Sequence, residues 1–137
     1  MPVALNDAPH TYEVNHHAYN SFASESSKYN LEVGRLASFS NSWPHPDDSI
    51  CSKKRMAKAG FFHTGKNDCV KCFVCQIKLE GWEPTEDEPW QKHAEAAPKC
   101  QFAKLGKEEG QMTVEEWMDT FCNQAIHLLE SKLSNLR

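Results

Sequence analysis

The chain has 137 residues, a formal net charge of −4 and six cysteines, which suits one small domain with tails. The acidic balance argues against nonspecific nucleic-acid binding, because that requires a basic surface. No stretch approaches the ~20 apolar residues of a membrane span, and Met1–His10 lack the features of a signal peptide. We therefore expect a protein of the nucleus and cytoplasm, where six cysteines indicate metal binding before disulfides.

The N-terminal third combines a polar arm with two short helices. Residues 1–28 are polar and aperiodic, which predicts a flexible arm before a domain over residues 29–106. Ser52 is a plausible N-cap for a second helix, which Gly60 would end. The first helix would present one apolar face, made of Leu31, Val33, Leu36 and Phe39.

The middle of the chain predicts a hairpin followed by a helix. Residues 70–74 and 77–79 are short apolar runs on either side of a tight turn, a pattern typical of paired strands. Asp87 or Glu88 would then cap a helix whose first turn contains Pro89.

Residues 107–137 predict a charged linker and a separate amphipathic helix. Thr113 and Glu116 form a capping-box pattern, and a helix of ~22 residues would be about 33 Å long. An apolar face this wide favours packing against helices of a partner, although the helix could instead fold back on its own domain. The strongest part of the stripe is Val114, Trp117, Met118, Phe121, Ala125, Leu128 and Leu129.

The clearest chemical signal is the spacing Cys72-x2-Cys75-x17-His93-x6-Cys100. Three thiolates and one imidazole predict one closed, tetrahedral, structural zinc ion. A closed site leaves no position for substrate, so metal catalysis is not expected. Two alternatives stand beside this interpretation. Cys69 forms a second C-x-x-C pair with Cys72 and could compete as a ligand, or the cysteines could simply be reduced and buried.

These residues resemble the BIR domain of the inhibitor-of-apoptosis family over about residues 30–105. The resemblance implies a small α+β fold, with a three-stranded antiparallel sheet, short helices and one zinc ion, before the C-terminal amphipathic helix. The segment from Met112 to Trp117 is similar to the survivin-type branch of the family. The Cys75-to-His93 spacing is one residue longer than the family's usual spacing. The segments that carry the match are Arg35–Phe39, Trp43–Pro44, Met56–Phe61, Cys72–Cys75, Pro89–Trp90, His93 and Cys100.

An acidic and aromatic segment predicts a peptide-binding groove. Residues 80–90 contain five acids, two tryptophans and no base. Carboxylates can receive a protonated amine, and indole faces add apolar and cation–π contact. The alternative is a solvated acidic loop beside two core tryptophans. The resemblance implies binding of a free N-terminal alanine, with Asp87 as the best partner for the amine. The expected lining residues are Leu79, Glu80, Trp82, Glu86 and Asp87.

In survivin-type proteins this groove reads the N-terminal tail of histone three, phosphorylated on its third residue. The basic residues after alanine would suit Glu80, whereas the phosphate needs a cationic site. Its candidates are His63, Lys66 and Lys71, although a solvated loop histidine is the other interpretation of His63. Ala96 occupies a position where the family often has histidine or an aromatic residue.

The resemblance therefore implies a non-enzymatic adaptor of the chromosomal passenger complex. Its C-terminal helix would dock the helices of borealin and the inner centromere protein, and indirectly Aurora B kinase. This complex acts at centromeres and the spindle midzone in chromosome segregation and cytokinesis. The alternative is an inhibitor of apoptosis that binds caspases or pro-apoptotic peptides through the same groove. A homodimer stays open, and neither a membrane nor nucleic acid is expected as a direct partner.

Overall fold

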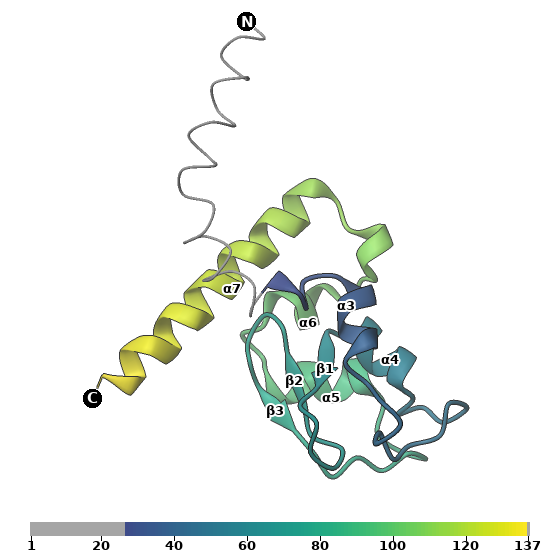
Figure 1. The fold of residues 1–137 in the computed structure, drawn as a ribbon. Helices are drawn as coiled ribbons and strands as arrows, with labels where there is room; N and C mark the ends of the chain where they lie inside the picture. Colours follow the sequence, from purple (N-terminus) through teal and green to yellow (C-terminus); the bar gives the residue numbers. More distant parts are fainter. Residues whose placement is uncertain (1–26, 137) are drawn as a thin grey trace, which may run out of the picture.

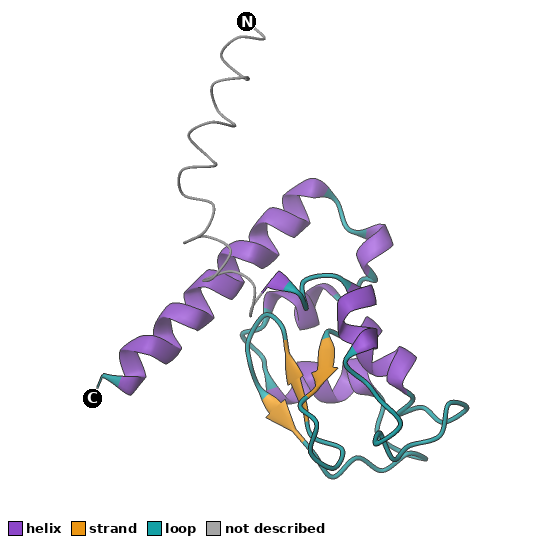
Figure 2. Ribbon diagram, viewed as in Figure 1, coloured by secondary structure: helices purple, strands orange, loops and turns teal. Residues whose placement is uncertain are grey.

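A three-stranded antiparallel sheet forms the centre of the structure, a computed structural model that describes residues 27–136 (Figure 1). The strands are β1 (Phe61–His63), β2 (Val70–Cys72) and β3 (Lys78–Leu79), in the order β1-β2-β3. The predicted arm over residues 1–28 lies outside the described residues, except for its last two. Short helices surround the sheet and a long helix follows them (Figure 2), so the predicted α+β fold is confirmed.

The strand register gives the sheet two chemically different faces. Because successive side chains of a strand point to opposite faces, the pairings separate an inner row from an outer row. The inner row is His63, Val70 and Leu79. The outer row is Phe62, Lys71 and Lys78. Val70 is fully buried and Lys78 is exposed, so the inner row faces the core.

The described residues place six helical segments around the sheet. The Ser52 hydroxyl accepts the Arg55 amide at 3.3 Å, as the predicted cap requires, and Glu88 caps the helix that begins at Pro89. The segments are α3 (Glu32–Ala37), α4 (Lys53–Lys58), α5 (Pro89–Ala96), α6 (Gln101–Leu105), the 3-10 turn η1 (Glu109–Gln111) and α7 (Val114–Asn135).

Gly60 joins α4 to β1 in a conformation that requires glycine. Its φ is +98°, and a Cβ at this position would lie 3.0 Å from the Phe102 ring and 3.4 Å from His93 Cε1. The backbone can therefore turn from the helix into the strand while it passes close to both rings.

Arg35 is a charged side chain at the centre of the core. It is fully buried, and its Nε donates to the Ala57 carbonyl at 2.8 Å. Its Nη1 donates to the carbonyls of Tyr29 at 2.9 Å and Asn30 at 3.1 Å, while the guanidinium lies 4.4 Å from the Phe73 ring centroid. Burial lowers its pKa to about 10, so it remains charged at neutral pH. Arg35 thus connects the segment before α3 to α4.

Helix α7 begins with the predicted capping box and runs for 22 residues. Its domain-facing contacts are polar: Asn123 Oδ1 accepts the Gln101 amide at 2.8 Å, and Gln124 Nε2 donates to the Phe73 carbonyl at 2.8 Å. Beyond these contacts the helix extends past the rest of the structure (Figure 1). Within residues 27–136, no helix combines the length and the apolarity that a bilayer crossing needs.

Candidate metal centre and peptide groove

The four predicted ligands converge on one point. The ligand atoms of Cys72, Cys75, His93 and Cys100 all lie within 4.8 Å of one another. Cys72 Sγ is 3.9 Å from Cys100 Sγ, and Cys75 Sγ is 3.8 Å from His93 Nε2. Sulfur ligands at about 2.3 Å from a tetrahedral zinc ion would be separated by about 3.8 Å. The cluster therefore fits one zinc ion, and the alternative in which Cys69 is a ligand is wrong.

Three structural elements position the zinc ligands. Cys72 ends β2, His93 lies in α5, and Cys100 precedes α6. His93 Nδ1 donates to the Ala59 carbonyl at 2.7 Å, which leaves Nε2 unprotonated and directed at the metal position. The ion would therefore hold the sheet, α5 and α6 together.

The electrostatics of the cluster also favour a cation. Burial raises the pKa of Cys72 well above its ordinary value. The neighbouring Cys100 sulfur raises the pKa of Cys75 to about 11. Hydrogen bonds from Cys72 and Cys75 lower the pKa of Cys100. Three sulfurs within 4.8 Å of one another, two of them buried, resist carrying three negative charges, and a dication offsets that repulsion.

The predicted groove residues lie along β3 and the loop that follows it. Leu79 and Asp87 are half-buried, Glu80 and Glu86 are exposed, and Trp82 is buried. Within the described residues β3 pairs only with β2, so its outer edge offers unpaired backbone groups. An extended peptide can add to such an edge as a further strand.

The loop before α5 closes on itself through hydrogen bonds. The amides of Glu86 and Asp87 both donate to the Glu83 carbonyl, at 3.1 and 2.9 Å. In return, Asp87 Oδ2 accepts the Glu83 amide at 2.8 Å. Asp87 Oδ1 lies 3.6 Å from Lys92 Nζ. Asp87, which the sequence predicts as the partner of a peptide amine, therefore uses one carboxylate oxygen to close the loop and has Lys92 near the other.

Asp68 belongs to the residues that carry the family resemblance, but the sequence did not indicate its role, which is to hold the backbone after β3. Its Oδ1 accepts the Gly81 amide at 2.9 Å, and its Oδ2 accepts the Trp82 amide at 2.8 Å and contacts His45 Nε2 at 2.9 Å. Burial would raise its pKa, but these hydrogen bonds outweigh burial and hold the pKa below its ordinary value. Asp68 thus fixes the backbone that presents Trp82. Its partners lie at least 13 residues away, where no local motif indicates them.

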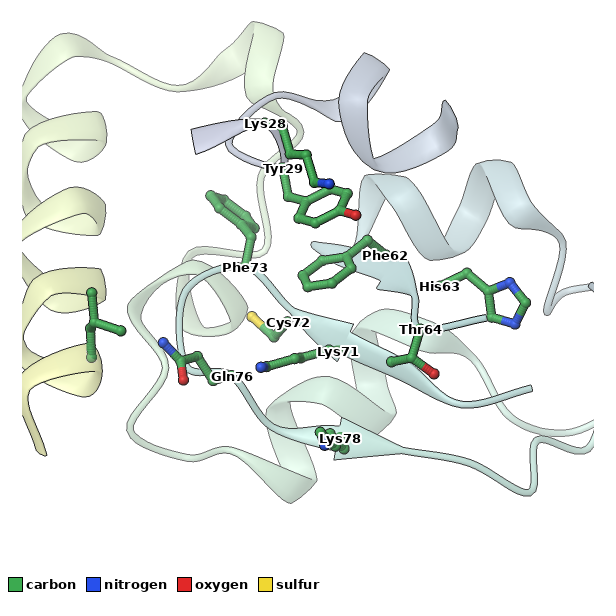
Figure 3. Close-up of a pocket in the computed structure, with 11 residues that line it drawn as sticks. Lys28, Tyr29, Phe62, His63, Thr64, Lys71, Cys72, Phe73, Gln76 and Lys78 are labelled. Atoms are coloured by element: carbon green, nitrogen blue, oxygen red, sulfur yellow. The ribbon is translucent and has the colours of Figure 1, made fainter. Parts of the chain in front are cut away.

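The three candidates for binding the phosphate lie in different surroundings in the structure. His63 is buried in β1, where Nε2 contacts the Asn67 carbonyl at 2.8 Å, so the interpretation of a solvated loop histidine is wrong. Its ring points away from the centre of the pocket in Figure 3. Lys66 is exposed and lines a pocket of about 340 Å³ with Glu80. Lys71 lies on the outer sheet face, in another pocket.

The apolar stripe of α7 stays largely uncovered within the described residues. The exposed fractions are 77% for Val114, 62% for Met118, 38% for Phe121 and 59% for Leu129. Ala125 is also exposed, whereas Trp117 and Leu128 are half-buried. The Trp117 and Phe121 rings are stacked, with centroids 5.2 Å apart. The helix therefore contacts its own domain mainly through polar side chains and leaves the stripe accessible.

Comparisons with known proteins show to which family this sequence is related. A family model described as "BIR: Inhibitor of Apoptosis domain" matches residues 35–104. The chain is 44% identical over 93 residues to Baculoviral IAP repeat-containing protein 5.2-B of Xenopus laevis, which covers 66% of this chain and 57% of the relative. It is 36% identical over 108 residues to Baculoviral IAP repeat-containing protein 5 of Mus musculus, which covers 77% and 76%.

The matched region spans just over half the length of the Xenopus relatives. A crystal structure of DIAP1 BIR1 bound to a Grim peptide is 35% identical, with a TM-score of 0.48 over 54% of this chain and 71% of that chain.

Proposed function

This chain belongs to the Inhibitor of Apoptosis (BIR) domain family, and from that premise we propose that it is a non-enzymatic adaptor of the chromosomal passenger complex. Its groove would read the N-terminal tail of histone three, phosphorylated on the third residue. Its helix α7 would dock the helices of borealin and the inner centromere protein, and so Aurora B kinase indirectly. The protein would reside in the nucleus and cytoplasm and act at centromeres and the spindle midzone in mitosis.

The unpaired edge of β3, beside the acidic loop, is the observation that carries the groove proposal. A tail with a free N-terminus would extend the sheet along β3, with its alanine against Leu79 and Trp82. Its α-amine would take the position of Lys92 Nζ near Asp87 Oδ1, now 3.6 Å apart. Asp68 supports this binding by holding the Trp82 amide.

The phosphate of the tail would sit in the pocket that Lys66 lines. Lys78 lines the same pocket, as does Glu80, so cations and an acid lie next to each other there. Glu80 suits a basic side chain of the tail, and the two lysines suit the phosphate. Lys78 was not among the sequence-based candidates, because a lysine in a two-residue edge strand has no distinguishing pattern.

An alternative function is antagonism of apoptosis through caspases or pro-apoptotic peptides with a free N-terminus. The apolar surfaces of Leu79 and Trp82 would favour such peptides if an apolar, proline-containing sequence followed the alanine.

Calorimetric titration with two free-amine peptides tests both functions. One peptide is the histone-three tail with a phosphorylated third residue, and the other has an apolar, proline-containing sequence after alanine. We expect tighter, phosphate-dependent binding of the histone peptide and none of its N-acetylated form. Preference for the apolar peptide would move the function to apoptosis antagonism, and binding of neither would contradict the groove proposal.

The variant Asp87→Asn should weaken free-amine binding about tenfold or more, because it removes the charge of a charge-assisted hydrogen bond. Asparagine keeps an oxygen that can accept the Glu83 amide, so the loop should stay closed. The control Asp119→Asn removes the same charge from α7, far from the groove. Unchanged affinity of Asp87→Asn in the same titration would refute the role of Asp87.

The variant Phe121→Glu should separate the protein from its helical partners, because it places a charge in the exposed stripe of α7. The matched control Ser134→Glu adds the same charge at an exposed position about 100° around the helix from the nearest stripe residue. Co-purification with borealin and the inner centromere protein measures the loss, and the thermal midpoint checks that the BIR fold is intact. Retained co-purification of Phe121→Glu would count against a helical bundle.

A further inference from the structure

A pocket of about 510 Å³ lies on the outer face of the sheet, and it shares Lys78 with the smaller pocket proposed for the phosphate. Its described lining contains Lys28, Lys71 and Lys78 and no acidic residue, although the whole chain has a net charge of −4. Figure 3 shows Lys71 extending across the pocket and Lys28 lying over Tyr29. We call this site the lysine pocket. Its volume is typical of ligand-binding pockets.

Two of its lysines are directly opposed across the sheet. Lys71 of β2 pairs in register with Lys78 of β3, and like charges directly opposite each other destabilise a sheet. Neither lysine forms an ion pair with any residue in the described range 27–136. A bound anion would lie between two cationic side chains that have no ion-pair partner in the described residues.

Part of the remaining wall of the pocket is aromatic and aliphatic, and Thr64 and Gln76 add polar groups. The rings of Tyr29 and Phe62 stack at 3.7 Å with an interplanar angle of 5°, and Lys28 Nζ lies 5.0 Å from the Tyr29 centroid. Phe73 and Leu128 also line the pocket, so α7 contributes to it. A ligand that fits this wall needs apolar groups beside its negative charges.

We propose that the lysine pocket binds an acidic peptide segment of a partner protein, in which carboxylates alternate with apolar side chains. Carboxylates would neutralise Lys71 and Lys78, and an apolar side chain would lie against Phe62 and Leu128. A nucleic acid fits less well, because its phosphate backbone needs a longer basic surface and the acidic chain would repel it. The segment needs no free N-terminus, so its binding does not require Asp87, although Lys78 lines both pockets.

The probe is a seven-residue peptide of alternating glutamate and phenylalanine, N-acetylated so that it cannot bind as a free amine. Calorimetry on the full chain should show binding that weakens between about 50 mM and 300 mM salt. The double variant Lys71→Gln/Lys78→Gln should weaken it about tenfold. The double variant Lys53→Gln/Lys54→Gln removes the same charge from α4 and should leave it unchanged.

Three outcomes would overturn the proposal. The first is equal binding of the same peptide with glutamine in place of glutamate. The second is unchanged binding by the Lys71→Gln/Lys78→Gln variant. The third is tighter binding of a ten-residue oligothymidine at the same lysines, which would make the site a nucleic-acid site. Because Lys78 also lines the proposed phosphate pocket, the variant Lys66→Gln, which changes that pocket alone, should leave binding of the acetylated peptide unchanged and so separates this site from the groove.

The variant Lys78→Glu provides a second test that does not need the peptide. It replaces the opposed lysines with an ion pair, so the thermal midpoint should rise by about 2–4 °C while the acidic peptide loses affinity. Zinc content reports that the fold is retained. A lower midpoint with zinc still bound would show that Lys71 and Lys78 do not repel each other, and would remove the basis of the site.

Discussion

Replacing His93 with alanine should release the zinc ion and unfold the BIR domain. A structural zinc ion contributes an apparent 10–16 kcal/mol, which matches or exceeds the ~5–15 kcal/mol total stability of a small domain. His93 also donates to the Ala59 carbonyl, so the substitution removes a ligand and a link to α4 together. Metal analysis should give one zinc ion per wild-type chain and none for the variant, and thermal unfolding should lose its cooperative transition.

His127 provides the matched control, because it lies on α7 and outside the metal cluster. The variant His127→Ala should keep one zinc ion per chain and a thermal midpoint close to that of the wild type. A metal-free His93→Ala protein that unfolds like the wild type would show that the ion does not stabilise the fold.

Replacing Arg35 with methionine should lower the free energy of unfolding by about 3–5 kcal/mol. Methionine fills a similar space but cannot donate to the carbonyls of Ala57, Tyr29 and Asn30, and these buried acceptors would lose their partner. Denaturant titration with zinc present measures the change. Arg35→Lys should recover only part of the stability, because an ammonium cannot reach acceptors in the planar arrangement of a guanidinium.

The control for this change is Arg55→Met on α4, where the arginine is exposed. Its free energy of unfolding should stay within about 0.5 kcal/mol of the wild type. If Arg35→Met were equally mild, the buried hydrogen bonds of Arg35 would not be a source of stability.

The sequence predicted best those features that depend on spacing along the chain. The zinc ligands form two short-range patterns, C-x-x-C and His-x6-Cys. The structure brings the ligand atoms of all four residues together. The helix that begins after Thr113 is also confirmed, because a capping box and 22 residues of apolar periodicity define it locally. The Ser52 cap belongs to the same class of local signal.

Features that depend on tertiary pairing were missed. Strand β1 has three residues and α6 has five, which is too short for periodicity to distinguish them from loops. His63 was interpreted as a loop residue because a turn follows it, but pairing with Val70 makes it part of the sheet. Asp68 acts on Gly81 and Trp82, and only the folded chain brings them together.

The polar contacts of α7 with the domain fix how far the helix extends from it. Asn123 and Gln124 anchor the middle of the helix to the domain, whereas its C-terminal end extends beyond the domain (Figure 1). At 1.5 Å per residue, its 22 residues form a rigid rod about 33 Å long. A partner held at the far end of this rod would be kept at a set separation from anything bound along β3. The length of the helix would then set the distance between two bound proteins, and so which sites both can contact at the same time.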